Sequence, residues 1–424
     1  MATKLWVGNA VAVAQVDDIT PANVEVGDIF TVTINGKSVS YTAVAATVAD
    51  VTAGLVAALN LSTIQEFAEI TWADATTKLT ATADTAGKPF TLTTSTTNGG
   101  AADTQTLTRT ASVANAGPNV WDTPNNWDGG VVPITGDDVI IGTEGGDILY
   151  GLDQSAVTLL TLTILQGFAN TIGLPETNAD SSTEYPEYRD TYLKVGATDI
   201  VIGTGAGNGS SRIKINTGAV QTTMLVKNSG QSSDDAVPAI LWKGTHASNA
   251  VNINRGDVGI AVLAGETATV KTLRTSFISS IIGDVTLRCG SGTMLNGAGS
   301  ITIIAGGTIS IESDTLSISQ TEGDLTLDGS SAHAELDMDG GNCHYNTDGT
   351  LTQGKVGSDA ELDCSQDIRS RTFTDLELHE GSTFKDPNKT VTFTNPIQLP
   401  RTGVEKLKEL VLGDHYTIQR GTLA

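Results

Sequence analysis

The sequence has few cationic side chains for its length, and this shortage excludes one broad class of function. Lysine and arginine together number 24 against 48 aspartates and glutamates, so the 424-residue chain carries a formal net charge of −24. Such an excess of negative charge repels the phosphate backbone, and we expect no nucleic-acid partner. The same acidity keeps a strand-rich protein soluble and discourages strands from pairing edge to edge.

Cysteine is also scarce. The chain has three, Cys289, Cys343 and Cys364, which are widely spaced and form no CxxC pair. An odd and scattered set indicates neither a disulfide framework nor a zinc site, so we expect each to pack as a small apolar residue. We predict no metal and no cofactor.

Long hydrophobic runs are absent as well. No run approaches the length that a membrane-spanning helix needs, so we expect no membrane insertion. The first residues, MATKLWVGNAVAVAQVDD, contain one lysine, and Gly8, Asn9 and Gln15 interrupt their apolar stretch. This is a poor signal peptide, and we expect synthesis in a cytoplasm.

Helical periodicity is almost absent from residues 136–398, which consist of short β-branched runs closed by Gly, Asn, Asp or Ser. Examples are DDVIIG (137–142), DVTLRCG (284–290) and DLTLDG (324–329). Such recurring strands predict a right-handed parallel β-helix, or β-solenoid. Three strands in a coil of roughly 20 to 30 residues would give about ten coils, and at about 4.8 Å per coil a rod on the order of 50 Å long.

Residues 17–112 differ from the rest and predict a small α+β module with the order ββαβββ. Asn35 and Gly36 separate two alternating runs, which is typical of a β-hairpin with a type I′ turn. Residues 48–60 then take a helical period behind Thr47, a suitable N-cap. Thr-rich strands follow. The whole chain is therefore mainly β.

Three further segments complete the organisation. We divide the chain into an N-terminal arm (1–16), the ββαβββ module (17–112), a linker with an aromatic cap (113–135), the solenoid (136–398) and a C-terminal cap or oligomer contact (399–424). The last segment predicts one short helix, because four apolar residues share a face before Gly413. These four residues are Val404, Leu407, Leu410 and Val411.

Two tryptophans lie where the solenoid would begin. Trp121 and Trp127 occupy a Pro/Gly-rich loop, and large rings there can cover the exposed end of a solenoid core. The alternative is that they stack on a sugar ring. Two polar insertions, 175–192 and 228–238, are too long for turns, and such loops on a regular scaffold are where partner contacts concentrate.

Acidic side chains recur at outward positions in the last third of the chain. Strand alternation projects Asp324, Asp328, Glu335, Asp337, Asp339, Glu361, Asp363, Asp375, Glu377 and His379 away from the core. The array is either a solvated acidic face or a glycan-hydrolysing or cation-binding site. If the array is a solvated acidic face, no residue is catalytic. If it is a glycan-hydrolysing site, Asp337 and Asp339 are the candidate catalytic residues.

Two other candidate sites have weaker support from the sequence. Asp337, Asp339, Cys343 and His344 are metal-ligand types, but their mixed spacing on one Gly-rich turn is not one that a metal class demands. The Gly-rich stretch 203–209 lacks the following helix that a phosphate loop requires, so we interpret it as a turn.

Parts of the sequence resemble known viral families. The run FTVTINGKSVSYTAVAATVADVTAGLVAALN, followed by ITW and LTATADTAGKPFTLT, is similar to a small module of structural proteins of tailed bacteriophages, especially tail-associated ones. It covers about a quarter of the chain and contains no catalytic signature. The stretch WDTPNNWDGGVVPITGDDVIIG resembles the opening of many extracellular and viral β-helix proteins.

The resemblance implies a virion structural protein, either a capsid decoration or head-fibre protein or a tail fibre or spike component. It also implies homotrimers, contacts with other capsid or tail proteins, a place in the virion, and host attachment with a surface glycan as a further partner. One alternative is a glycan-depolymerising tailspike enzyme, although aromatic residues make up only 5% of the chain. The other is a bacterial surface adhesin, which the poor signal peptide disfavours.

Overall fold

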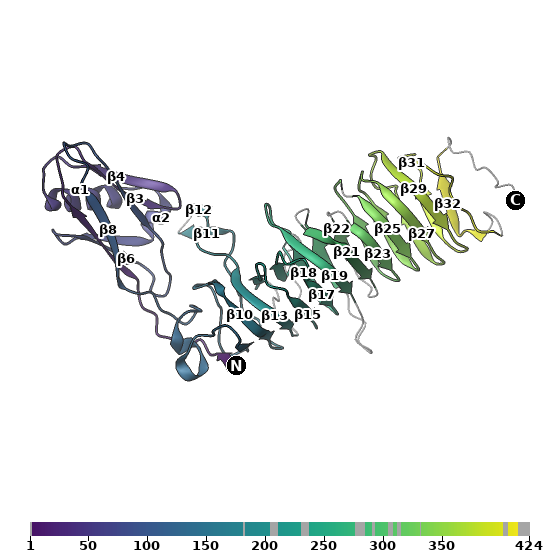
Figure 1. The fold of residues 1–424 in the computed structure, drawn as a ribbon, viewed down its shortest axis with the longest axis horizontal. Helices are drawn as coiled ribbons and strands as arrows, with labels where there is room; N and C mark the ends of the chain where they lie inside the picture. Colours follow the sequence, from purple (N-terminus) through teal and green to yellow (C-terminus); the bar gives the residue numbers. More distant parts are fainter. Residues whose placement is uncertain are drawn as a thin grey trace.

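The computed structural model describes residues 2–180, 183–203, 211–229, 237–275, 285–290, 293–303, 308–311, 315–330, 332–401 and 406–413. A small first module is followed by a long stack of strands that runs to the C-terminal end (Figure 1). The fold is mainly β, as the sequence predicts. Within the described ranges, no helix combines the length and apolar character needed to cross a membrane.

Two antiparallel sheets and two helices form the first module. Its elements are β2 (Val16–Ala22), β3 (Ile29–Ile34), β4 (Lys37–Thr42), α1 (Val48–Asn60), α2 (Gln65–Ala68), β5 (Ile70–Asp74), β6 (Leu79–Ala83), β7 (Thr93–Thr97) and β8 (Thr106–Val113). The strand order is β5–β6–β2–β8 in one sheet and β4–β3–β7 in the other. β2 and β8, which pair with each other, are absent from the predicted ββαβββ order.

The local predictions for this module are confirmed. Asn35 and Gly36 both take positive φ angles, 52° and 71°, as a type I′ turn between β3 and β4 requires. Helix α1 begins at Val48, and the Thr47 hydroxyl accepts a hydrogen bond of 3.2 Å from the Asp50 amide. Leu55 is fully buried on the inner face of α1.

The solenoid contains two long series of parallel strands (Figure 1). The first series is β1 (Thr3–Trp6), β9 (Asp138–Ile141), β10 (Asp153–Ile164), β13 (Leu193–Ile202), β15 (Thr223–Val226), β17 (Ala250–Ile253), β19 (Ala268–Thr275), β21 (Thr293–Ile303), β23 (Thr315–Gln320), β25 (His333–Met338), β27 (Leu351–Val356), β29 (Arg371–Leu378) and β31 (Val391–Phe393). Each strand pairs with the next one in this series, because the chain returns to the same side once per coil.

The second series lies between members of the first in sequence. It comprises β14 (Ile213–Asn216), β16 (Ile240–Lys243), β18 (Gly256–Ile260), β20 (Val285–Cys289), β22 (Thr308–Ile311), β24 (Asp324–Leu327), β26 (Gly341–Tyr345), β28 (Ala360–Asp363), β30 (Thr383–Asp386) and β32 (Glu409–Leu412). Two short 3₁₀ helices, η1 (Pro124–Asn126) and η2 (Asp128–Gly130), precede the solenoid body, and a hairpin of β11 (Thr177–Asp180) and β12 (Thr183–Pro186) projects from it.

The prediction of three separate strands per coil is wrong, because some long strands serve two sides of the coil. The first residues of β13 pair with β14, whereas its last four residues pair with β15. Coil length also varies. The register pairs Thr223 with Ala250 in an early coil and Glu335 with Gln353 in a later one, so the later coil is the shorter.

One position repeats along the first series, and its side chains are buried wherever the structure describes them. The register aligns Trp6, Ile141, Ile164, Ile202, Val226, Ile253, Thr275, Ile303, Gln320, Met338, Val356 and Leu378 one above another. We call these twelve residues the inward ladder. Eleven steps of about 4.8 Å give a length of about 53 Å, close to the predicted rod.

The first strand corrects the expected domain boundaries. Residues 1–16 were expected to form an N-terminal arm, but Thr3–Trp6 is β1, the first strand of the solenoid, and pairs in parallel with β9. The first module is therefore an insertion between the first two strands of the solenoid. The local sequence of so short a strand could not reveal this, since its partner follows the whole first module.

The C-terminal helix is a further correction. Glu409–Leu412 is strand β32, which pairs in parallel with β30, so Leu410 lies beside Phe384 and Val411 beside Lys385. Leu407 packs partly buried against the solenoid core. Val404 lies outside the described residues. Leu410 and Val411, which were expected on a helix face, thus extend the second series of strands.

Truncation of one inward side chain tests the core directly. Leu336 is 1% exposed and lies between Ile318 and Gly354 in neighbouring coils. We expect Leu336→Ala to lower the free energy of unfolding by about 2–5 kcal/mol, because it removes buried methyl groups and leaves a cavity. Glu335→Ala, an exposed neighbour on the same strand, should change it by less than about 0.5 kcal/mol. Equal effects in denaturant titrations would contradict the assigned register.

The cysteines supply a second test. All three are buried and unpaired, as expected, and burial raises the pKa of the Cys289 thiol to about 12 and those of Cys343 and Cys364 above their ordinary value. At pH 8 the thiols are therefore neutral as well as shielded. We expect iodoacetamide to modify none of them in the folded protein and all three in guanidinium chloride, measured by intact mass. Rapid native modification would refute the placement of these coils.

Candidate functional site

The predicted aromatic cap exists and includes a third ring. Trp6, Trp121 and Trp127 are at most 2% exposed, and their ring centroids lie 4.6 to 6.4 Å apart. The indole N–H of Trp6 donates to the Gly145 carbonyl at 2.7 Å, and that of Trp127 donates to the Trp121 carbonyl at 2.7 Å. Since the ring faces are buried, sugar stacking on Trp121 or Trp127 is excluded.

Asn126 joins the two chain segments that connect the cap to the first module. Its side-chain amide donates to the carbonyls of Gly117 and Val120, both at 2.7 Å, and its Oδ1 accepts from the Ala10 amide at 2.8 Å. The residue is fully buried. It therefore fixes the outgoing and returning segments side by side at the base of the module.

The insertion 175–192 forms a second connection to the first module. It contains the β11–β12 hairpin, and Arg189 just after it donates to the Glu69 carboxylate and, at 2.6 Å, to the Pro89 carbonyl. Asn178 and Lys88 also donate to Glu69, each at 3.0 Å. We call this set the Glu69 clamp. The insertion was expected to carry partner contacts, which stays a prediction; in the structure several of its side chains bind the first module of the same chain.

Tyr188 completes the clamp. Its hydroxyl donates to Glu69 Oε2 at 3.4 Å, and its ring lies 4.3 Å from the Arg189 guanidinium. Burial raises the pKa of the Tyr188 phenol, so it stays a neutral donor across the physiological range. Four donors therefore converge on one carboxylate between the module and the solenoid.

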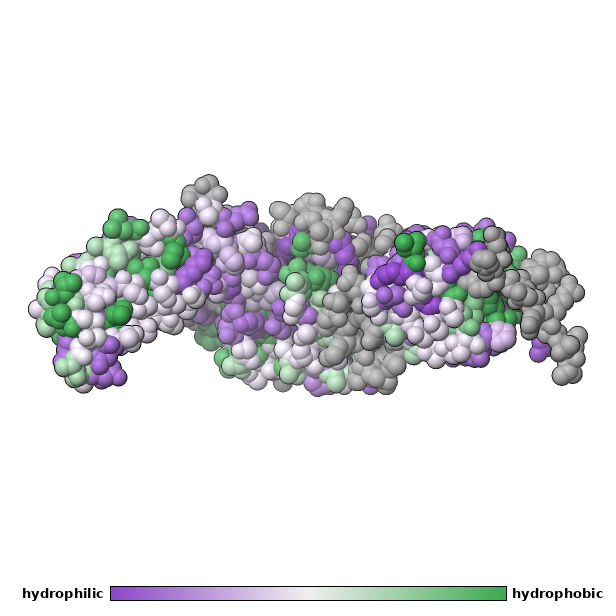
Figure 2. Space-filling model, turned by 90° about the horizontal axis from the view of Figure 1, so that it is seen from above, coloured by the Kyte–Doolittle hydropathy of each residue, from purple (hydrophilic) through white to green (hydrophobic). Residues whose placement is uncertain are grey.

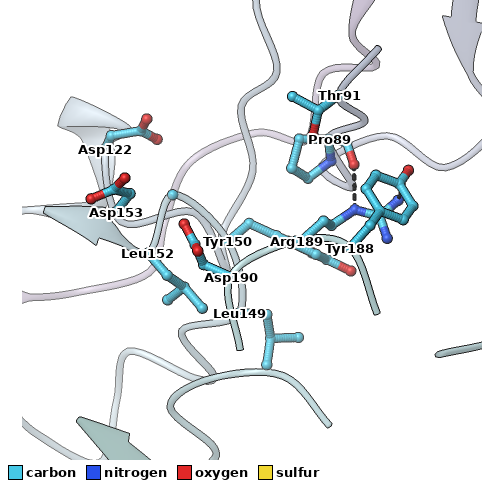
Figure 3. A pocket seen from close by; sticks show the side chains of 11 residues that line it. Pro89, Thr91, Asp122, Leu149, Tyr150, Leu152, Asp153, Tyr188, Arg189 and Asp190 are labelled. Atoms are coloured by element: carbon cyan, nitrogen blue, oxygen red, sulfur yellow. Dashed lines mark hydrogen bonds between the residues drawn. The ribbon is translucent and has the colours of Figure 1, made fainter. Parts of the chain in front are cut away.

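A cavity of about 260 Å³ opens beside the clamp (Figure 3). Pro89 and Thr91 of the first module line it together with Tyr150 and Leu152 of the solenoid, and three carboxylates, Asp122, Asp153 and Asp190, face the same space. The cavity therefore lies at the joint between the two parts of the chain.

The charged groups of this cavity are largely engaged within the protein. Asp153 accepts hydrogen bonds from the Ser155 hydroxyl and amide, which hold its pKa below the usual value. Asp190 forms an ion pair with Lys194. Desolvation raises the pKa of Asp122. No nucleophile with a neighbouring base lines the cavity, and no group of three or more metal-ligating side chains gathers in the described part of the chain.

The outward carboxylates of the first series are separated by other side chains. The register places Gln353 between Glu335 and Asp375, and Lys355 between Asp337 and Glu377. Lys355 Nζ lies 3.7 Å from Asp337 Oδ1. Two carboxylates of adjacent coils therefore do not meet in either column.

The second series shows the same separation. Asn342 lies between Asp324 and Glu361 and donates to Asp324 at 2.8 Å. Lys385 bonds Glu361 at 2.8 Å, and His344 Nδ1 lies 3.5 Å from Asp363. Asp363 is only 7% exposed, so the outward position that alternation predicted for it is wrong. The other groups form a face of interspersed charges rather than a focused acid–base pair.

The two candidate catalytic residues remain outside any cavity described above. Asp337 is partly exposed beside Lys355, and Asp339 is exposed at the turn after β25.

Cys343 is fully buried, whereas His344 is partly exposed, so the mixed cluster noted in the sequence is divided between core and surface. Residues 204–209 of the Gly-rich stretch and 230–236 of the second insertion lie outside the described residues.

Comparison with known proteins gives no relative. No protein-family model, curated protein or solved structure matches the chain. Function must therefore be inferred from the residues and their geometry.

Loss of the clamp should release the first module from the solenoid. We expect Arg189→Ala to broaden the interatomic distance distribution in small-angle X-ray scattering, because removing one partner of a buried ion pair costs about 3–5 kcal/mol. Lys37→Ala removes the ion pair with Glu66 inside the module and is the matched control. The clamp has no orienting role if the two variants scatter alike.

Proposed function

We propose that the protein is a structural component of a tailed-bacteriophage virion, in which the solenoid projects as a stiff body and the first module docks. The inward ladder carries this proposal. The twelve aligned residues of the ladder lie in a continuous stack of hydrogen-bonded coils, and bending this stack strains the hydrogen bonds between coils. Such a body suits mechanical display, whereas catalysis would need a cleft with converging groups.

The first module has the features of a docking end. Val26 and Val44 are 58% and 72% exposed, and the hydrogen bond of 2.9 Å between the Gly27 amide and the Ala43 carbonyl holds their two loops together. Hydrophobic surface is visible on this module, at the left of Figure 2. Exposed apolar side chains of this kind suit a protein partner. The hydrogen bonds of Asn126 and the Glu69 clamp would transmit the orientation of a docked module to the rod.

The attribution to a phage rests on the resemblance of the first module to tail-associated proteins. Within the virion, a capsid decoration or head fibre and a tail fibre or spike fit the architecture equally well. Other virion proteins would hold the module, homotrimers would be the assembled state, and a host surface glycan would be the outer partner. The acidic surface suits an exposed, soluble position.

Labelling of intact particles tests the virion assignment. Gold-conjugated antibodies against the solenoid surface are applied to purified particles of the phage that encodes this chain. In electron micrographs they should mark one site on the head or tail. A particle lacking the gene is the control. Absence of the chain from purified particles by mass spectrometry would overturn the proposal.

The glycan-depolymerising alternative has its own test. Purified protein incubated with host capsule or cell-wall glycan should release no reducing ends. Release that Asp337→Asn or Asp339→Asn abolishes would replace the display function by an enzymatic one.

For the adhesin alternative, the chain would have to be found on the bacterial surface in cells without phage particles.

A further inference from the structure

The cavity at the joint between the first module and the solenoid contains a carboxylate whose charge is poorly compensated. Asp122, Asp153 and Asp190 reach this cavity from three separate segments of the chain (Figure 3). Asp153 accepts a hydrogen bond from Ser155, and Asp190 forms an ion pair with Lys194. For Asp122, its own backbone amide is the group that counters the desolvation raising the carboxyl pKa. Asp122 therefore remains the carboxylate that a ligand can neutralise.

Another part of the cavity wall is apolar and aromatic. Tyr150 and Leu152 line it from the solenoid, and Pro89 lines it from the first module. Burial raises the pKa of the Tyr150 phenol, so this ring stays neutral across the physiological range. A carboxylate stabilises an ammonium or guanidinium group by charge-assisted hydrogen bonds, and a neighbouring aromatic ring adds a cation–π attraction. The wall thus provides both kinds of contact that an organic cation uses.

Charge and size exclude the other classes of ligand. An anion would meet the three carboxylates, and the Arg189 guanidinium that could hold it is already paired with Glu69 and Glu187. A metal ion needs several ligands close together, and the ranges that the structure describes contain no such group. A neutral sugar would leave the charge of Asp122 uncompensated. The volume of about 260 Å³ is below the range of about 300–1,000 Å³ for drug-sized ligands, so it admits one small molecule or one side chain.

The cavity is open to solvent and is shared by the two parts of the chain. Asp122 and Thr91 both line it and are both exposed, so a ligand reaches it without unfolding either part. Thr91 belongs to the first module, whereas Asp122 lies in the cap at the start of the solenoid. A ligand held between them stabilises the arrangement in which the two walls meet. Its effect therefore adds to that of the Glu69 clamp.

We propose that the joint cavity binds an organic cation, a primary ammonium or guanidinium group, with Asp122 as its principal counter-ion. Asp153 and Asp190 add negative potential around the group, and the Tyr150 ring contacts it from the solenoid side. The cation is either a free diamine or the Lys or Arg side chain of a neighbouring protein. This inference goes beyond the proposed display function, because the site needs no other part of a virion.

Isothermal titration calorimetry of the full chain tests the class of ligand. The probes are putrescine, a short diamine, and a capped Gly-Arg-Gly peptide. We expect both to bind in about 0.15 M salt, which screens general attraction to the acidic surface. The uncharged diol of the same length as putrescine should not bind. Tighter binding of putrescine identifies a free diamine as the source of the cation, and tighter binding of the peptide identifies a protein side chain.

Three variants test the place of binding. Asp122→Asn should weaken binding of both cations by about tenfold or more, because it removes the counter-ion. Thr91→Trp should weaken it as strongly by filling the cavity, and it leaves every carboxylate in place. Glu144→Gln is the matched control, since Glu144 is an exposed carboxylate that does not line the cavity, and it should bind as the unmodified chain does.

The proposal is overturned if neither cation binds, if the diol binds equally well, or if Asp122→Asn and Thr91→Trp bind as tightly as the control. Equal urea midpoints for the variants and the unmodified chain would show that any loss of binding is local. Gold labelling of the particle does not depend on the cavity, so a failed titration would leave the virion assignment intact.

Discussion

Hydrogen bonding between the backbones of successive parallel coils is the constraint on which the solenoid depends. The strands of each described coil pair in parallel with strands of the coils on either side. Each coil must therefore return its inward residue to the same position around the long axis, one strand spacing further along it, which produces the inward ladder. Polar rungs need internal partners: the Gln320 amide donates to the Gly323 carbonyl at 2.8 Å and to the Asn342 carbonyl at 3.0 Å. At the first coil the tryptophans cover the core, and in the last coils Phe373, Phe384 and Phe393 pack against one another.

Features encoded locally could be predicted from the sequence, whereas features that depend on distant pairing could not. The Asn35–Gly36 hairpin and helix α1 behind Thr47 follow from turn and capping chemistry, and both are confirmed. Strand β1 has no local signal, because its partner lies beyond the whole first module. The prediction of a C-terminal helix was wrong because Leu410 and Val411 pair with β30, and this pairing overrides their helical spacing.

The same distinction applies to the surface. Alternation correctly predicts that Asp337 and Glu377 point outward, since that property belongs to one strand. Which side chain lies between them depends on the register of three coils, and only the structure shows that it is Lys355. Likewise the sequence indicated Trp121 and Trp127 as a cap, but it did not indicate Trp6 or the convergence of Arg189 on Glu69.

The molecule is thus a capped rod with an inserted module held at two points, and its stiffness follows from the regular stacking of coils. Double electron–electron resonance measures that stacking most directly. Asp199 and Gln353 are exposed and lie seven rungs apart in one outward column. Spin labels on Asp199→Cys and Gln353→Cys, with the native thiols buried, should give a single narrow distance of about 34 Å. A broad distribution, or a distance far shorter than this one, would contradict the parallel stack of coils.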